Sequence, residues 1–250
     1  MAIQTTSLTE WLKANPTVVS NAIKDDFLKI AKNDIVDMMN KNLTALGDGV
    51  FIGKLQREST YSYMRMEEWN RTNIGITQAD ADAIVIQYGG YRLGIALDEV
   101  TRQWGSSTTV VVNNNQDLNS YDGKACTAAI MANAAFSADS PDTYAVAYAY
   151  AYSKGHTGDP GGDSTIAAKS WWLPTMGDLA LIHDHFNTIN LAIARINAAG
   201  KQQATPLNRA NYWSCVEAGA SVARILSFGN GNRGYNSRGN QNRVRPVTAW

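Results

Sequence analysis

The sequence predicts a mixed α+β fold, because helix-type and strand-type patterns alternate along most of the chain. Gly89 and Gly90 separate two β-rich runs, and a two-residue glycine connection of this kind is typical of a tight hairpin. Residues 125–136 are rich in alanine, which has the highest helix propensity. Thr175 with Asp178 three positions later matches a capping box, which predicts the start of a further helix.

Residues 1–72 are expected to form a separate helical segment. Pro16 suits the first turn of a helix, with Asn15 as its cap. Apolar side chains then recur at steps of three to five residues between Val19 and Met38, which predicts an amphipathic helix. Its apolar stripe either packs on the chain's own domain or packs against other copies of itself, as an oligomerising base does.

The following region carries strand patterns and then two helix patterns. Strands are expected over residues 83–88 and 91–97, and the β-branched run 108–112 has the same character. Asp122 is expected to open the alanine-rich helix, and Asp142 to cap another that ends at Tyr152. The alternation of Tyr and Ala in that second stretch also fits a strand, but its alanine content favours a helix.

The composition excludes several classes of protein. A hydrophobic content of 44% and a charged content of 18% are ordinary for a globular protein. The 22 basic residues balance the 22 acidic ones, so there is no electrostatic case for nucleic-acid binding. The first residues lack the pattern of a signal peptide, and no apolar run is long enough to span a membrane. Cys126 and Cys215 lie far apart, so we expect two reduced thiols.

The C-terminal stretch has a polar middle between apolar and basic ends. Residues 229–242 are almost wholly Gly, Asn, Ser, Arg and Tyr, which predicts loop or irregular strand. This composition fits either a floppy surface loop or a binding surface, since binding surfaces favour the same residue types. The strand-like anchors on both sides, such as Trp213, Phe228 and Val244, favour a displayed binding surface.

Several motifs give this stretch a family resemblance. They are Tyr212-Trp213-Ser214, Ala223-Arg224-Ile225-Leu226, Phe228, Gly231-Asn232 and Arg243-Val244-Arg245-Pro246-Val247, with Trp104-Gly105 and Trp171-Trp172-Leu173-Pro174 upstream. Together they resemble the target proteins of diversity-generating retroelements, which include phage receptor-binding proteins of the major-tropism-determinant kind. The resemblance implies a C-type-lectin-like (formylglycine-generating-enzyme-like) domain over residues 73–250, with a variable region at approximately residues 208–243.

The residue types of the variable region agree with that resemblance. These retroelements copy a template with errors at adenines, so an asparagine codon of the AAY type becomes a diversified codon. Such codons never encode Lys, Glu, Gln, Met or Trp. Between Ala218 and Asn242 the sequence contains Gln241 as the single member of this excluded set.

The resemblance implies ligand contacts from the small and polar side chains of this region. The candidates are Asn211, Cys215, Ser221, Asn230, Asn232, Arg233, Tyr235, Asn236, Ser237, Arg238, Asn240 and Asn242. Tyr235 is the expected energetic anchor, and Arg233 and Arg238 are expected to make bidentate or cation–π contacts with a ligand. The residues assigned to the scaffold are Tyr212, Trp213, Phe228, Val244 and Val247. Arg243 and Arg245 either pair with buried acids or carbonyls or lie on the surface.

No catalytic residue, metal site or cofactor is predicted. His183 and His185 point to different faces of a helix, so they are expected to be solvated surface residues. Residues 158–163 include two aspartates that suit calcium, but the ligand spacing of a calcium loop is missing and a plain turn is favoured. The glycines of residues 229–234 lack the Lys-Ser/Thr that follows in a phosphate loop.

The expected function is a ligand- or receptor-binding protein that a retroelement diversifies, as a phage or prophage tail-associated or surface-displayed adhesin. One alternative is a structural virion protein without a fixed target. A further alternative is an enzyme on the same scaffold, but that chemistry uses paired thiols and Cys215 has no partner near it in sequence.

The expected partner is an unknown protein or glycan on a cell surface. A homo-oligomer is expected, with a trimer favoured, and neither nucleic-acid binding nor membrane insertion is expected. The expected location is the virion or the cell surface, after synthesis in the cytoplasm without a signal peptide.

Overall fold

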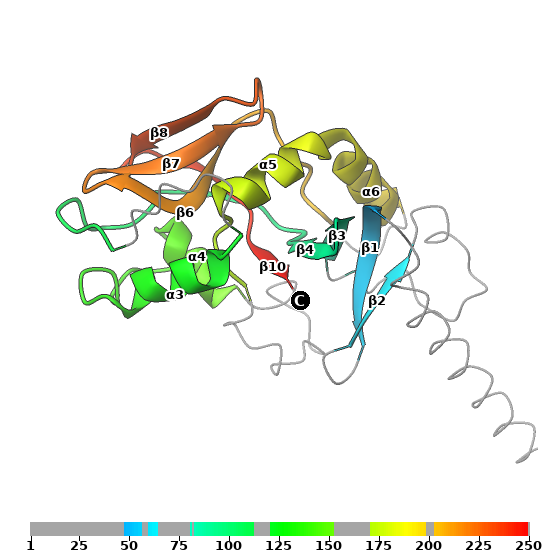
Figure 1. Cartoon of the computed structure of the whole chain (residues 1–250), viewed down its shortest axis with the longest axis horizontal. Helices are drawn as coiled ribbons and strands as arrows, with labels where there is room; N and C mark the ends of the chain where they lie inside the picture. Colours follow the sequence, from blue (N-terminus) through cyan, green and yellow to red (C-terminus); the bar gives the residue numbers. More distant parts are fainter. Residues whose placement is uncertain are drawn as a thin grey trace, which may run out of the picture. The chain divides into compact units, whose positions relative to one another are not determined.

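The computed structural model describes residues 48–56, 60–64, 81, 83–112, 121–152, 171–198 and 203–249. All of them belong to one compact unit that spans residues 47–250. Within the described residues the unit contains two five-stranded sheets and the helices α3 to α6, labelled as in Figure 1. The mixed α+β class is therefore confirmed. The amphipathic helix expected between Val19 and Met38, and the turn expected at residues 158–163, lie outside the described residues.

The first sheet is antiparallel, with the strand order β10-β4-β3-β1-β2. Its strands are β1 (Gly49–Gln56), β2 (Thr60–Met64), β3 (Ala83–Tyr88), β4 (Tyr91–Ile95) and β10 (Val247–Ala249). β3 and β4 form the hairpin predicted at Gly89 and Gly90, where φ is +54° and +85°. Positive φ at both positions is what a type I′ turn requires, and glycine adopts it without strain.

The domain begins earlier in the sequence than expected, because the first sheet includes residues before residue 73. β1 pairs with β3, so residues 49–64 belong to the sheet. The compact unit accordingly begins at residue 47, whereas the sequence placed the boundary at residue 73.

The second sheet contains the C-terminal stretch and has the order β5-β9-β6-β7-β8. Its strands are β5 (Val100–Arg102), β6 (Asn211–Gly219), β7 (Val222–Ser227), β8 (Arg233–Ser237) and β9 (Asn242–Val244). β6, β7 and β8 are antiparallel neighbours, whereas β9 runs parallel to β6. The polar stretch 229–242 thus includes strand β8, which forms one edge of this sheet. Residues 108–112, in contrast, form no strand.

Two helices begin at side-chain caps. α3 (Gly123–Ala132) is opened by the Asp122 side chain, which accepts a hydrogen bond from the Ala125 amide. α5 (Met176–Asp184) has the predicted capping box, in which Thr175 and Asp178 each accept a hydrogen bond from the other's backbone amide. Gly123 is required at the start of α3, because a Cβ there would lie 2.5 Å from the Trp172 ring.

The other two helices differ from α3 and α5 in how they begin. α4 (Ala145–Ala151) starts after Tyr144 and not at Asp142, so that the expected cap is wrong although the helix is correct. α6 (Phe186–Ala198) follows α5 almost directly. None of the helices in the described part of the chain is long and apolar enough to cross a membrane.

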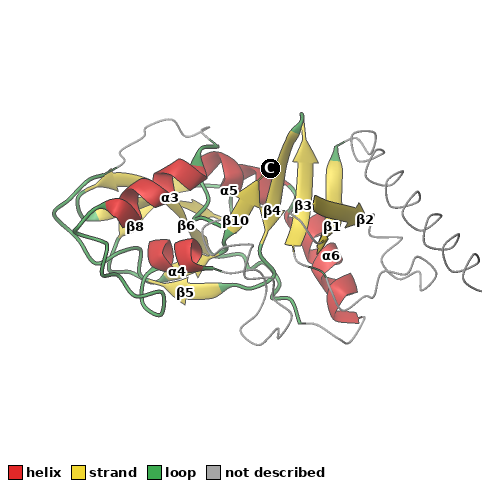
Figure 2. Ribbon diagram, turned by 90° about the horizontal axis from the view of Figure 1, so that it is seen from below, coloured by secondary structure: helices red, strands yellow, loops and turns green. Residues whose placement is uncertain are grey.

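The helices connect the two sheets through one apolar core. α3 and α5 pack on β6, α5 also packs on β7, and α6 packs on β1 and β3. Figure 2 shows α3 and α4 beside the second sheet. The residues assigned to the scaffold, Tyr212, Trp213, Phe228, Val244 and Val247, are all buried, which confirms that assignment. The indole N–H of Trp104 donates to the Ser214 carbonyl at 2.7 Å, so this buried ring also ties the chain before α3 to β6.

Candidate functional site

The exposed candidates of the predicted variable region lie on β8 and on the turns beside it. We call this set the β8 surface and define it as Ser221, Asn230, Asn232, Arg233, Tyr235, Ser237 and Asn240, all of which are exposed. Tyr235 is 65% exposed, which is high for a large aromatic side chain. These seven residues are the predicted ligand-binding candidates that the structure leaves accessible to a partner.

The alternation of a strand explains why some positions of this stretch are exposed and others are not. Along β8, Arg233, Tyr235 and Ser237 face solvent, while Gly234 and Asn236 are half-buried. The Asn236 amide is held between two neighbours, because Asn240 donates to its oxygen at 2.6 Å and its nitrogen donates to Asn242. Asn211, at the start of β6, is likewise half-buried.

Arg238 does not belong to the exposed surface, which corrects the sequence prediction. Its side chain is fully buried, and Nη2 lies 2.6 Å from Glu217 Oε1. Nη2 also donates to the Gly219 carbonyl, and Nη1 donates to two carbonyls of the loop before α3, those of Ser107 and Val110. The guanidinium lies 4.6 Å from the centre of the Trp104 ring. Arg238 therefore binds the protein itself, and its position is structural.

Cys215 and Asn242 are also buried, so they are not accessible to a ligand in this structure. Cys215 is completely buried in the middle of β6. Asn242 is 7% exposed and begins β9, where it pairs with Arg102 of β5. Sequence composition did not distinguish Asn242 from the exposed asparagines, because both lie in the same run of Gly, Asn, Ser and Arg.

A second buried arginine fixes the far end of the variable region. Arg245 donates to the Glu99 carboxylate at 3.0 Å and to the backbone carbonyls of Ala96, Leu97 and Thr205. Of the two alternatives left open by the sequence, Arg245 thus takes the buried one. The Arg243 side chain is 37% exposed, and its Nε lies 3.5 Å from Oε1 of the same Glu99 carboxylate.

The turn between β7 and β8 is held closely against α5. Gly231 has a φ of +74°, and a Cβ there would lie 3.3 Å from the His183 ring. The Ser227 amide donates to the Asn232 carbonyl at 2.9 Å, and the Gly231 amide donates to the Ser227 carbonyl at 2.7 Å. Gly231 is therefore needed for its backbone conformation, and a side chain there would also crowd the His183 ring.

The two histidines of α5 have separate structural contacts. The His183 ring lies 5.6 Å from the Phe228 ring, and His185 Nδ1 lies 2.9 Å from the Leu181 carbonyl. Both are half-buried, so the prediction that they are simply solvated is wrong. Within the described ranges, no group of three side chains is arranged to hold a metal ion.

The two cysteines, distant in sequence, are brought together by α3 and β6. Cys126 Sγ lies 3.1 Å from the Cys215 carbonyl oxygen, and both side chains are buried free thiols. Burial raises the pKa of the Cys215 thiol well above its ordinary value, and the neighbouring Cys126 and Asp178 raise it further. The thiolate is the reactive form of cysteine, so this environment opposes nucleophilic chemistry at Cys215.

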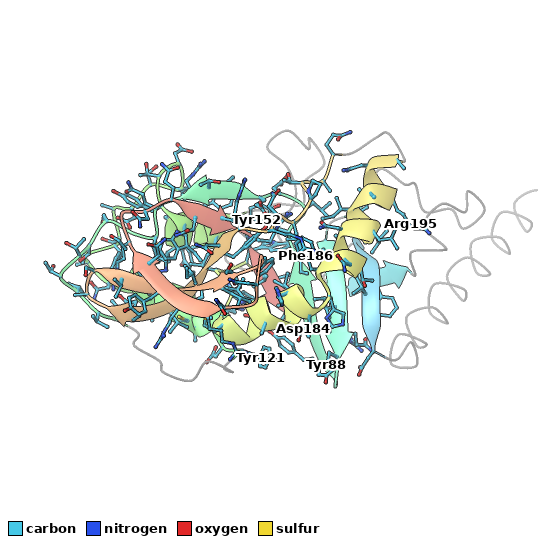
Figure 3. The ribbon with its side chains drawn as sticks, turned by 90° about the horizontal axis from the view of Figure 1, so that it is seen from above. Tyr88, Tyr121, Tyr152, Asp184, Phe186 and Arg195 are labelled. Carbon is cyan, nitrogen blue, oxygen red and sulfur yellow. The ribbon has the colours of Figure 1, made fainter. Side chains whose placement is uncertain are left out.

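A pocket of about 390 Å³ lies beside the β8 surface. It is lined by Tyr88, Tyr121, Leu181, Asp184, His185 and Arg233, which come from four separate parts of the chain. Figure 3 shows the labelled Tyr88, Tyr121 and Asp184 along one side of the molecule. Of these residues the sequence predicted only Arg233, because no local pattern connects the other five.

Comparison with known proteins gives little further information. No family model matches the sequence, and no curated protein matches it. Among solved structures, the chain is similar to a fimbrial protein from Bacteroides ovatus, with a TM-score of 0.43 and 12% sequence identity. The similarity covers 80% of this chain and 43% of that one, so the chain spans less than half the length of the fimbrial protein.

Proposed function

We propose that the chain is a ligand-binding protein with a C-type-lectin-type domain, diversified by a retroelement and carried by a phage or prophage tail or displayed on a surface. The observation that carries the proposal is that the side chains of residues 228–245 divide into an exposed polar group and a buried group. Exposed polar residues alternate there with buried anchors, and the buried anchors join this stretch to the core.

The anchors make the surface suitable for variation. Phe228 stacks on Tyr212 at 4.1 Å before the polar stretch, Arg238 is buried within it, and Arg245 is buried after it. Side chains of the β8 surface therefore change without loss of a core contact. Every residue of the β8 surface also belongs to the set that altered AAY codons encode.

The chemistry of the β8 surface suits recognition of varied targets. Tyr235 offers a large aromatic contact with few rotatable bonds, and the asparagines and serines supply hydrogen bonds that adapt to different partners. The strand beneath them is paired with β7 without any ligand, and a backbone fixed in this way lowers the entropic cost of association.

A library test examines the proposal directly. In the full chain, positions 230, 232, 235, 237 and 240 are randomised with codons that end in a pyrimidine, and the clones are selected on an arbitrary protein bait. We expect most clones to fold, with melting temperatures close to that of the parent, and binders to be recovered. The matched control randomises the buried positions 212, 228, 238 and 242, where we expect most clones to be unfolded.

The two libraries also give the result that would contradict the proposal. If clones varied on the β8 surface unfold as often as those of the control, the surface is part of the folding core and is not a site of diversification. The neighbouring DNA offers an independent check. We expect a near-identical repeat with AAY codons at the exposed positions, but not at Arg238 or Phe228, beside a reverse transcriptase gene.

A further inference from the structure

The pocket beside the β8 surface combines one residue of the variable region with residues outside it. Arg233 is on β8, whereas Tyr88 ends β3, Tyr121 precedes α3, and Asp184 and His185 lie at the end of α5. Its volume of about 390 Å³ falls within the range of small-molecule sites. Four of these five side chains would thus stay constant when the variable region changes.

Two tyrosine rings provide the apolar walls of this pocket. Tyr88 is 57% exposed and Tyr121 is 45% exposed, and both are among the exposed large hydrophobic side chains of the described residues. The Tyr121 ring lies 4.7 Å from the Tyr91 ring, and Tyr91 itself is fixed by donating its hydroxyl to Asp178. Tyr121 is therefore held by its contact with the Tyr91 ring, while its exposed part offers an aromatic surface to a ligand.

The polar groups of the pocket include both charges. The Asp184 carboxylate only accepts hydrogen bonds, and the Arg233 guanidinium only donates them. His185 donates from Nδ1 to the Leu181 carbonyl, so that in the neutral ring Nε2 is an acceptor. An anionic ligand would meet Asp184 and a cationic ligand would meet Arg233. A neutral ligand with several hydroxyl groups satisfies both, because each hydroxyl donates and accepts.

The position of Asp184 supports a role in binding. It is the last residue of α5, where the helix dipole disfavours a negative charge. Its carboxylate is 75% exposed, and its ion-pair contact is His183 Nδ1 at 3.7 Å, which is charged only when that ring is protonated. Because such an exposed ion pair is worth little, the carboxylate contributes little to the stability of the fold, although it lines the pocket.

We propose that this pocket binds one neutral sugar residue of a cell-surface glycan, stacked on the tyrosine rings and hydrogen-bonded by Asp184 and Arg233. The proposal rests on the proposed ligand-binding function and names its ligand class. Tyr88, Tyr121 and Asp184 would recognise a sugar in every clone, and the residue at position 233 would adjust which sugar is preferred.

The test uses methyl glycosides of glucose, galactose, mannose and N-acetylglucosamine with the full chain, measured by saturation-transfer NMR and calorimetry. We expect millimolar binding of at least one of them. Tyr121→Ala and Asp184→Asn should each weaken that binding at least tenfold, whereas Tyr235→Ala, outside the pocket, should leave it unchanged. Asp184→Asn should also keep or raise the melting temperature, which separates a loss of binding from a loss of folding.

Two results would overturn the proposal. One is that none of the four neutral glycosides binds, or that a charged sugar such as N-acetylneuraminic acid or glucosamine binds more tightly than all of them. The other is that binding survives both pocket variants. These outcomes leave the library test unaffected. If the library yields binders but no glycoside binds, only the proposal of a sugar pocket is rejected. If a glycoside binds but the library yields no binders, only the proposal of diversification is rejected.

Discussion

Arg238 and Glu217 form an ion pair of 2.6 Å between Nη2 and Oε1, and neither side chain has any exposed surface. The other carboxylate oxygen of Glu217 accepts a hydrogen bond from the Val112 amide at 2.7 Å. One buried pair thus joins the turn after β8, strand β6 and the loop that precedes α3. A stretch whose composition suggests a floppy loop is thereby held at its centre.

Removal of this arginine should destabilise the protein strongly. Arg238→Ala leaves the Glu217 carboxylate buried without its partner, and breaking a buried pair in this way costs about 3–5 kcal/mol. Arg233→Ala, in the exposed row of β8 five residues earlier, is the matched control and should change stability by about 0.5 kcal/mol or less. Urea unfolding of both variants measures the difference. Equal effects would mean that the buried pair does not hold the segment.

Truncation of the aromatic anchor Phe228 should destabilise the protein far more than truncation of residues on the β8 surface. Phe228→Ala removes a ring that stacks on Tyr212, and such a change in a core costs about 3–5 kcal/mol. Ser237→Ala and Asn240→Ala alter exposed side chains and should cost about 0.5 kcal/mol or less. Calorimetric melting provides the comparison. A large loss of stability from the exposed pair, with none from Phe228, would invert our assignment.

Asp178 should give the protein a measurable pH dependence. Burial raises its pKa from 3.8 to about 6, although hydrogen bonds from Thr175 and Tyr91 partly oppose this shift. Because the folded state binds the Asp178 proton more tightly than the unfolded state does, protonation of this carboxyl stabilises the fold. This stabilisation is complete below the pKa of Asp178 in the unfolded chain, and it is lost as the pH rises through about 6. A shift of about two pKa units corresponds to about 3 kcal/mol.

The variant Asp178→Asn removes this titration while keeping a similar shape. We expect the wild type to lose up to about 3 kcal/mol of stability relative to the variant between about pH 4 and pH 7. Denaturant unfolding at several pH values measures this difference. A difference that stays constant across that range would show that the buried carboxyl does not titrate there.

The oligomeric state remains a prediction that depends on the N-terminal segment. Linked copies of a weak binding surface gain avidity, and the apolar stripe between Val19 and Met38 offers a means of association. We expect the full chain to be a trimer by light scattering and a chain of residues 47–250 to be a monomer. This truncation keeps β1 and β2, which a start at residue 73 would remove from the sheet. Trimers from both chains would locate the interface within residues 47–250, and monomers from both would leave the stripe packed on its own domain.

Local signals in the sequence predicted the elements that depend on neighbouring residues. The glycine pair at the β3–β4 hairpin and the Thr175–Asp178 capping box each act within a few positions, and both are confirmed. The aromatic anchors were predicted because large apolar side chains on both sides of a polar run require burial. The C-type-lectin-type fold rests on resemblance and stays a proposal.

Pairings between distant residues were beyond local patterns. Arg238 meets Glu217 across 21 positions, and Arg245 meets Glu99 across 146 positions. An arginine among glycines and asparagines has the same local sequence whether it faces solvent or a buried acid. The pocket was missed for the same reason, since Tyr88, Tyr121 and Asp184 come together only through the packing of α5 beside both sheets.

Strand β8 lies at the edge of its sheet among the described strands, and this limits which variants remain usable. An edge strand presents unpaired backbone groups that pair readily with another chain. Altered AAY codons encode Ile, Val and Phe but never Lys, the residue that most often protects such an edge. A clone with apolar side chains at positions 233, 235 and 237 would therefore tend to stack against its own copies. Selection on this surface would therefore act against self-association as well as for affinity to a target.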